Sequence, residues 1–79
     1  MTLSPEKRSA LELLAAAGAR GCTESIMLAH SFKIELLDGL VRDGLATAEP
    51  DRVRAGGRSI EVVRVLITDA GRRALAWRP

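Results

Sequence analysis

The chain has 79 residues, of which 47% are hydrophobic and 28% charged, and its formal net charge is +2 at pH 7. A chain this short is expected to form one domain, residues 1–79, and its hydrophobic content is that of a globular protein. No apolar run approaches the roughly 18 residues of a membrane span, no secretion signal opens the chain, and a single cysteine, Cys22, excludes an internal disulfide, so we expect a cytoplasmic location.

The first expected element is a helix that begins after Ser4 and closes at Gly18. The Ser4 side chain can accept from free amides of the first turn, Pro5 is tolerated there, and Glu6 suits the positive end of the helix dipole. Gly18 can take the backbone conformation that ends a helix. An apolar stripe at helical spacing comprises Ala10, Leu11, Leu14 and Ala17, with Leu13 at its edge.

Two more helices follow a connector, Ala19–Cys22, for which a brief extended segment is an alternative. Thr23 is expected to cap a short second helix, and a turn near His30 leads into a third helix that ends at Asp43, before Gly44. On a helical wheel the core stripe of the third helix comprises Ile34, Leu37, Leu40 and Val41, with Leu36 at its margin. The opposite, outward side comprises Glu35, Asp38, Gly39 and Arg42.

The hydrophobic period then changes from helical to alternating, which predicts a β-hairpin. Its strands are Leu45–Glu49 and Ser59–Ile67, the latter rich in β-branched residues. Pro50, which follows the first strand, indicates an edge position or a bulge because it donates no ladder hydrogen bond. Gly56-Gly57 supplies the positive φ angles of a tight turn. This turn places Ala55 opposite Arg58, Arg52 opposite Glu61 and Glu49 opposite Arg64. The last two pairs have opposite charges, which supports the register.

A last helix is expected after Thr68, which caps it, with Asp69 in the first turn. The predicted order is therefore helix, helix, helix, strand, strand, helix, in an α+β domain. No repeat, low-complexity segment or linker interrupts this order.

Charge is distributed unevenly along the chain. Residues 1–30 are balanced, residues 31–51 carry a net charge of −3, and residues 52–79, with seven arginines against two carboxylates, carry +5. Such asymmetry can mark a surface that faces a polyanion. The alternative is that the arginines keep an exposed edge strand soluble.

Two segments on either side of the basic hairpin resemble bacterial winged helix-turn-helix transcription regulators. They are Leu40-Val41-Arg42-Asp43-Gly44-Leu45 and Ile67-Thr68-Asp69-Ala70-Gly71. In the multiple-antibiotic-resistance-regulator class and its small relatives, the third helix typically ends in Leu-x-x-x-Gly-Leu, and the helix after the hairpin opens with Leu-Thr-x-x-Gly. The resemblance covers residues 11–75 and implies a winged helix: three helices, a two-stranded hairpin wing and a C-terminal helix.

The resemblance also implies double-stranded DNA as the partner and transcription regulation as the role. In that family the third helix enters the major groove, and the wing touches the neighbouring minor groove or the backbone. By position, the residues near the groove would be Ser31, Phe32, Lys33, Glu35, Asp38 and Gly39, and the wing contacts would be Arg52, Arg54 and Arg58. The chain departs from the family pattern in its short second helix and in the non-basic outer face of its third helix.

The residues themselves favour the hairpin over the third helix as the binding element. Phosphates flank every groove and neutralising them supplies most affinity, so Glu35 and Asp38 are interpreted as a solvated helix face. Arg54 and Arg58 can make forked contacts with phosphates beside a glycine tip, whereas Arg52 is expected to pair with Glu61. Phe32 is expected to anchor the third helix in the core.

No pattern in the sequence indicates catalysis, a metal, a cofactor or a small-molecule substrate. His30 has no partner at catalytic or ligand spacing. Cys22 is expected to pack as a small hydrophobe, with a redox sensor as the alternative. Leu75 and Trp77 are expected either to cover the edge of the core or to form a dimer contact.

The expected function is that of a small bacterial DNA-binding regulator. One module of this size would bind duplex DNA weakly, so a homodimer or a protein partner is expected. The alternative is a protein-interaction module that binds no DNA and uses either the acidic face of the third helix or the end that carries Leu75 and Trp77.

Overall fold

The computed structural model describes residues 3–76. In chain order these residues form α1 (Pro5–Ala17), the short 3-10 helix η1 (Gly18–Arg20), β1 (Cys22–Thr23), α2 (Glu24–Ala29), α3 (Ile34–Arg42), β2 (Ala46–Ala55), β3 (Arg58–Ile67) and α4 (Asp69–Ala76). The architecture is α+β, and the predicted order of the helices and the two hairpin strands is confirmed. No helix in this part of the chain is long and apolar enough to cross a membrane.

The strands form one antiparallel sheet in the order β1-β3-β2. The expectation of a two-stranded sheet is therefore wrong in one respect, because Cys22–Thr23 adds a third strand that pairs with Val65 and Arg64 of β3. Two residues are too few to show an alternating pattern, so the sequence could offer only an extended segment in the connector. β2 is an edge strand, as Pro50 predicted.

The helix boundaries follow from caps that the sequence predicted. Side-chain oxygens of Ser4, Thr23 and Thr68 accept hydrogen bonds from the amides of Lys7 (3.2 Å), Ile26 (3.3 Å) and Gly71 (3.0 Å), respectively. The Thr68 hydroxyl also donates to the Gly44 carbonyl at 2.7 Å, which ties the start of α4 to the end of α3.

The core lies between the helices and the base of the hairpin. Its buried side chains come from α1, α2, α3, the sheet and the connection between α3 and β2. They are Ala10, Leu11, Leu14, Cys22, Met27, Leu37, Leu40, Leu45, Ala46 and Val65. The stripe predicted on α1 is confirmed, because Ala10, Leu11 and Leu14 are fully buried and Leu13 and Ala17 pack against the core. Phe32 is half-buried against the same cluster, as expected.

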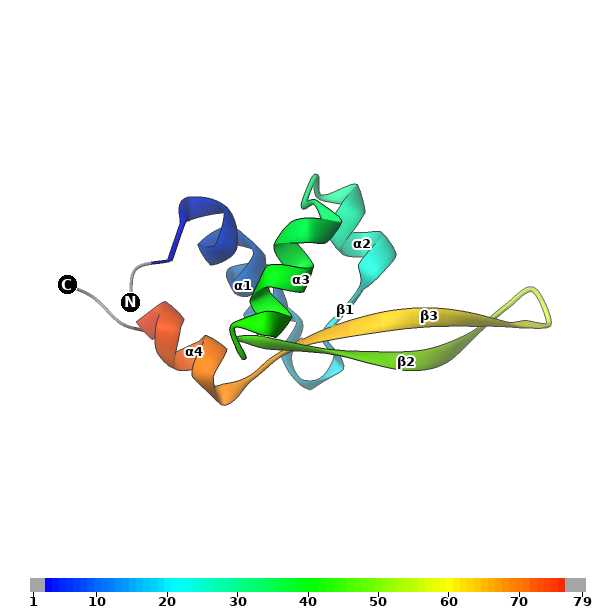
Figure 1. Cartoon of the computed structure of the whole chain (residues 1–79). Coiled ribbons are helices and arrows are strands. Elements are labelled where there is room, and N and C mark those ends of the chain that lie inside the picture. Colours follow the sequence, from blue (N-terminus) through cyan, green and yellow to red (C-terminus); the bar gives the residue numbers. More distant parts are fainter. Residues whose placement is uncertain (1–2, 77–79) are drawn as a thin grey trace.

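The hairpin of β2 and β3 projects from this body as an arm. Figure 1 shows the helices gathered around the base of the hairpin while its tip extends well beyond them, and the molecule measures 49 × 22 × 20 Å. Both strands have ten residues, but only Ala46 and Val65 of them are buried, and both lie towards the base. The distal part of the arm is a two-stranded ribbon in solvent.

Candidate nucleic-acid interface

The tip of the arm is an exposed basic feature of the molecule. Gly56 and Gly57 form the turn with φ angles of +59° and +78°, and the pairs Ala55–Arg58 and Arg54–Ser59 flank it. Nothing lies within 4 Å of a Cβ placed on either glycine, so a ligand can approach the backbone closely. Arg54 and Arg58 are exposed and take part in no ion pair within residues 3–76.

The register places these two arginines on opposite faces of the ribbon. Residues directly opposite one another share a face, and successive residues alternate between faces. Arg54 therefore lies on the face that carries Arg52, and Arg58 lies on the other. A ligand that contacts both must meet the arm end-on or wrap around its edge.

Arg52 has an ion partner, as the sequence predicted. Its guanidinium lies 3.4 Å from the Glu61 carboxylate, directly across the strands. Both side chains are largely exposed, at 73% and 80%, so the pair is screened by solvent and adds little to stability. Arg52 is thus the weakest of the three predicted hairpin contacts for an anion.

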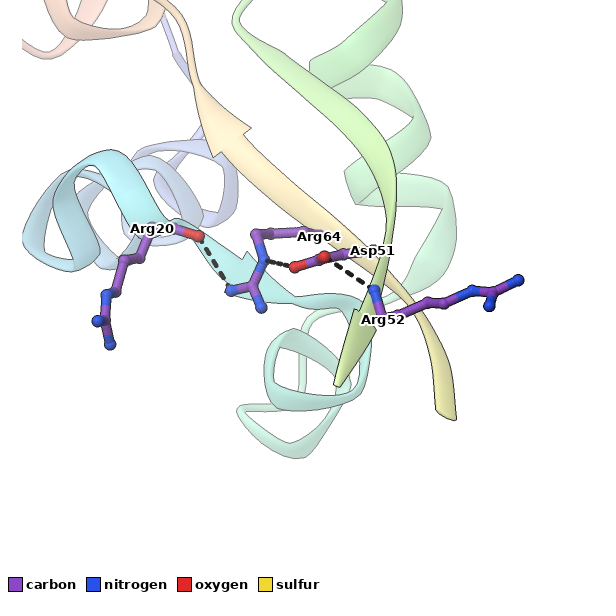
Figure 2. Close-up of polar contacts among 4 residues, drawn as sticks. All are labelled: Arg20, Asp51, Arg52 and Arg64. Atoms are coloured by element: carbon purple, nitrogen blue, oxygen red, sulfur yellow. Dashed lines mark hydrogen bonds and ion pairs between the residues drawn. The ribbon is translucent and has the colours of Figure 1, made fainter. Parts of the chain in front are cut away.

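Arg64 has a structural role that the sequence did not reveal. It lies opposite Glu49, as predicted, but its Nε donates to Asp51 at 2.8 Å and a terminal nitrogen donates to the Arg20 carbonyl at 3.0 Å. Figure 2 shows the Arg64 guanidinium between these two acceptors, with the side chain of Arg20 directed away. Arg64 therefore fastens the base of the arm to η1.

Asp51 is the acceptor at the centre of this arrangement. It receives the Arg64 side chain and the Arg52 backbone amide, the latter at 2.8 Å. These hydrogen bonds, that of Arg64 first, lower the pKa of the Asp51 carboxyl below its ordinary value of 3.8. The carboxylate is therefore held in its charged form and is occupied by the protein itself.

The outward face of α3 differs from the predicted one. Ile34 and Val41, expected in the core, are 38% and 39% exposed, while Leu37 and Leu40 are buried as expected. Gly39, expected outside, is half-buried and lies against the Lys7 side chain of α1, whose ammonium pairs with Asp43 at 2.9 Å. The exposed stripe consists of Ile34, Glu35, Asp38, Val41 and Arg42.

The helical wheel was wrong here because the apolar side of α3 is wider than the part of the helix that contacts the core. The sequence alone does not mark where that contact ends. The contact of α3 with α1 turns the helix so that both ends of the predicted stripe face solvent. The result is a surface of two carboxylates, two aliphatic side chains and one arginine. With two carboxylates and one arginine, such a surface cannot neutralise the phosphates that flank a major groove.

The turn between α2 and α3 contains the other predicted groove residues. His30 and Ser31 are exposed, and Ser31 adopts a φ of +72°, which is uncommon for a residue with a side chain. Lys33 is the exposed residue before the first turn of α3. The turn thus presents one cation, Lys33, whereas Phe32 is directed into the core.

No family model, curated protein or solved structure matches this chain.

The remaining candidate residues of the sequence are potential metal ligands, Cys22, Leu75 and Trp77. No group of three or more His, Cys, Asp or Glu side chains could hold a metal within residues 3–76. Cys22 is 7% exposed and belongs to the core, as expected of a small hydrophobe, and burial raises the pKa of its thiol, with Arg64 opposing in part. Leu75 is half-buried against the core, and Trp77 lies outside the described residues.

Proposed function

We propose that this chain is a winged-helix module that binds double-stranded DNA and acts in transcription regulation. The arm is the wing, Arg54 and Arg58 at its tip contact phosphates, and α3 lies near the major groove. The proposal rests on one observation above all. Two of the four arginines of the arm have no ion partner, and both stand at the end of a ribbon that reaches beyond the folded body, beside a turn that has no side chains.

The structure favours the arm over α3 as the source of affinity. Arg54 and Arg58 are two uncompensated cations, whereas the exposed stripe of α3 carries Glu35 and Asp38 against Arg42. Electrostatic contact with phosphates supplies most of the affinity of such modules and does not depend on base sequence. We therefore propose binding with little sequence preference, at a dissociation constant on the order of micromolar to 100 μM.

The test is a fluorescence-anisotropy titration of a mixed-sequence duplex at several salt concentrations. Each phosphate contact contributes about 0.9 to the slope of log K against log salt, so Arg54→Ala/Arg58→Ala should weaken binding and flatten the slope by about two units. The matched control is Arg72→Ala/Arg73→Ala, which removes the same charge from exposed positions of α4. An equal loss in both variants would mean that overall charge, rather than the tip, is responsible.

A second candidate function follows from the exposed stripe of α3. Ile34 and Val41 flank the carboxylates of Glu35 and Asp38, and aliphatic side chains beside charges suit a protein partner better than a groove. On this proposal the chain is an interaction module that binds no DNA. Absence of duplex binding even at low salt would favour it, and capture of a basic partner that Asp38→Lys abolishes would support it.

A further inference from the structure

One edge of β3 is left open over most of its length. β1 pairs with this edge only at Arg64 and Val65, because Thr23 caps α2 and the chain turns away from the sheet there. Between Ser59 and Val63, β3 therefore has β2 on one side and no strand of residues 3–76 on the other. Figure 1 shows α2 beside β3 and the arm continuing past it towards the tip.

The register identifies the backbone groups that face this open edge. Along an antiparallel strand, residues alternate between exchanging hydrogen bonds with the partner strand and directing their N–H and C=O groups away from it. The two-residue turn makes the pair beside it a bonded one, and the Thr68 amide, in the same series, donates to the Leu45 carbonyl at 3.1 Å. Even-numbered residues of β3 therefore bond to β2, and the residues that face the open edge are Ser59, Glu61 and Val63.

The open edge can accept another strand. No hydrogen bond from another part of residues 3–76 reaches the N–H or C=O groups of Ser59, Glu61 and Val63, which are all exposed. A row of such groups is a template for strand addition. At about 3.3 Å per residue this stretch is about 16 Å long, which suits a strand of about five residues.

The free edge of β2 is less suited to pairing. By the same alternation, Pro50, Arg52 and Arg54 direct their backbone towards it. Proline has no N–H to donate, and charged side chains on an edge discourage pairing. Between Ser59 and Val63, by contrast, β3 has no proline and a single charged residue. A partner strand is therefore expected on β3.

The surface beside the open edge is acidic and apolar. A hollow there is lined by Glu24, Ser25, Pro50, Ile60, Glu61, Val62 and Val63, without any lysine or arginine. Glu24 takes part in no ion pair within residues 3–76, and Glu61 pairs only with Arg52, at 3.4 Å and largely in solvent. Ile60 and Val63 are 46% and 39% exposed. A complementary partner must therefore bring positive charge together with apolar side chains.

We propose that the edge of β3 from Ser59 to Val63 binds an extended basic peptide of a partner protein, which adds a strand antiparallel to β3 beyond the end of β1. The peptide residue opposite Glu61 is lysine or arginine, because opposite residues share a face and this face adjoins the acidic hollow. Its two neighbours lie on the other face, beside Ile60 and Val62, and are β-branched. The peptide backbone supplies affinity and the alternation of side chains supplies specificity.

A second copy of the chain is a poorer occupant. Two copies that used the whole open edge would pair about a twofold axis at Glu61 and would place the two Glu61 carboxylates opposite one another, which is destabilising. The proposal is also independent of DNA binding. It uses neither Arg54 nor Arg58, and peptide binding is measured without DNA.

The probe is the peptide Thr-Val-Lys-Val-Thr, blocked at both ends, whose order of side chains is the same in both directions. A contact this small is expected to have a dissociation constant on the order of 1 mM. Two-dimensional amide NMR spectra of the full chain should show the largest shifts at Ser59, Glu61 and Val63, which gain hydrogen bonds. Ile60 and Val62 should shift less, because their amides already donate to β2.

Two N-methylated peptides test the backbone pairing without altering the protein. The lysine amide donates to the Glu61 carbonyl in the proposed register, so methylating its nitrogen should weaken binding at least about tenfold. The matched control is methylation of the first valine nitrogen, which faces away from β3. It should leave the dissociation constant within about twofold.

A change of charge tests the side-chain pairing. Glu61→Lys should weaken binding of the lysine peptide by about fivefold and should prefer the peptide Thr-Val-Glu-Val-Thr by about fivefold. Glu12→Lys makes the same change of net charge at an exposed site of α1 and should keep the wild-type affinity within about twofold.

Four results would overturn the proposal. The first is no shift at about 10 mM peptide, roughly ten times the expected dissociation constant. The second is an equal loss of affinity for the two methylated peptides, and the third an equal loss for Glu61→Lys and Glu12→Lys. The fourth is a set of shifts at Ser59–Val63 when the chain is concentrated without peptide, which would mean that a second copy occupies the edge.

Discussion

At the scale of single residues, the pairing of Arg64 decides which charges the arm can offer to a ligand. The sequence places Arg64 opposite Glu49, and the register agrees, but the guanidinium reaches the diagonal neighbour Asp51 and the Arg20 carbonyl instead. This choice occupies Arg64 and Asp51 and leaves Glu49 without an ion pair. Cross-strand neighbours could be predicted from the turn, whereas the choice between a direct and a diagonal partner could not.

The lowered pKa of Asp51 predicts a specific dependence of stability on pH. Because the carboxyl has a lower pKa in the folded chain than its ordinary 3.8, its stabilising contribution is complete above that value and is lost as the pH falls from 3.8 through the folded pKa. Urea unfolding of wild type and Asp51→Asn should therefore differ most at neutral pH and converge in acid. Glu12→Gln, at an exposed site of α1, removes the same charge elsewhere and is the matched control.

Two helical glycines predict opposite effects of the same substitution. A Cβ on Gly71 of α4 would overlap the Leu45 carbonyl oxygen and lie 2.7 Å from the Ile67 side chain, so Gly71→Ala should destabilise the chain by about 1–3 kcal/mol. A Cβ on Gly39 of α3 would meet only Lys7 at 4.0 Å, so Gly39→Ala should stabilise it by about 0.5–1 kcal/mol. Thermal unfolding measures both, and a stable Gly71→Ala would contradict this packing.

At the scale of elements, the sequence predicted those that carry a strong local signal. The arm was predicted with its register because Gly56-Gly57 defines the turn and the charges agree with it. η1 was not predicted, and β1 only as an alternative, a brief extended segment in the connector, because segments of two or three residues have no period. The type of α3 was predicted, and its C-terminal end to within one residue. Its rotation about its own axis depends on contacts with α1, which lies far away in the sequence.

The observed rotation of α3 leads to a test within one helix. Leu37 is 3% exposed and Val41 is 39% exposed, although the helical wheel placed both in the core. Leu37→Ala should therefore cost about 2–5 kcal/mol as a buried cavity, whereas Val41→Ala should change the free energy of unfolding by no more than about 0.5 kcal/mol. Chemical denaturation provides both values. A large loss for Val41→Ala would show that the helix is rotated towards the predicted orientation.

At the scale of the whole molecule, stability and the candidate site are separated in space. The buried side chains lie at one end, and Arg54 and Arg58 lie at the far end of the arm. The sequence predicted which arginines are accessible, because they flank the turn. The predicted register already implies that they lie on opposite faces of the hairpin. The sequence could not predict that the ribbon stands clear of the body, since the strands continue beyond the alternating segments that were recognised.

This separation predicts a gradient of hydrogen-exchange protection along the arm. Amides of β3 at Arg64 and Val65 lie between two strands and near the core, whereas those nearer the tip belong to a solvated ribbon. Native-state exchange should therefore show protection that falls steadily from Val65 to the tip, because the distal arm can open without disturbing the core. Uniform protection along β3 would mean that the arm and the core unfold as one unit.

The contacts of Arg64 with Asp51 and Arg20 lie where the arm leaves the body. Because the ribbon is attached to the body only at this end, a small rotation there causes a large displacement of the tip. From Arg64 to Gly57 the strand is about 23 Å long at about 3.3 Å per residue. A tilt of about 10° at that fulcrum would move the tip by about 4 Å, which is more than the length of a hydrogen bond. The position of Arg54 and Arg58 relative to the body thus depends on Arg64, a side chain at the other end of the arm.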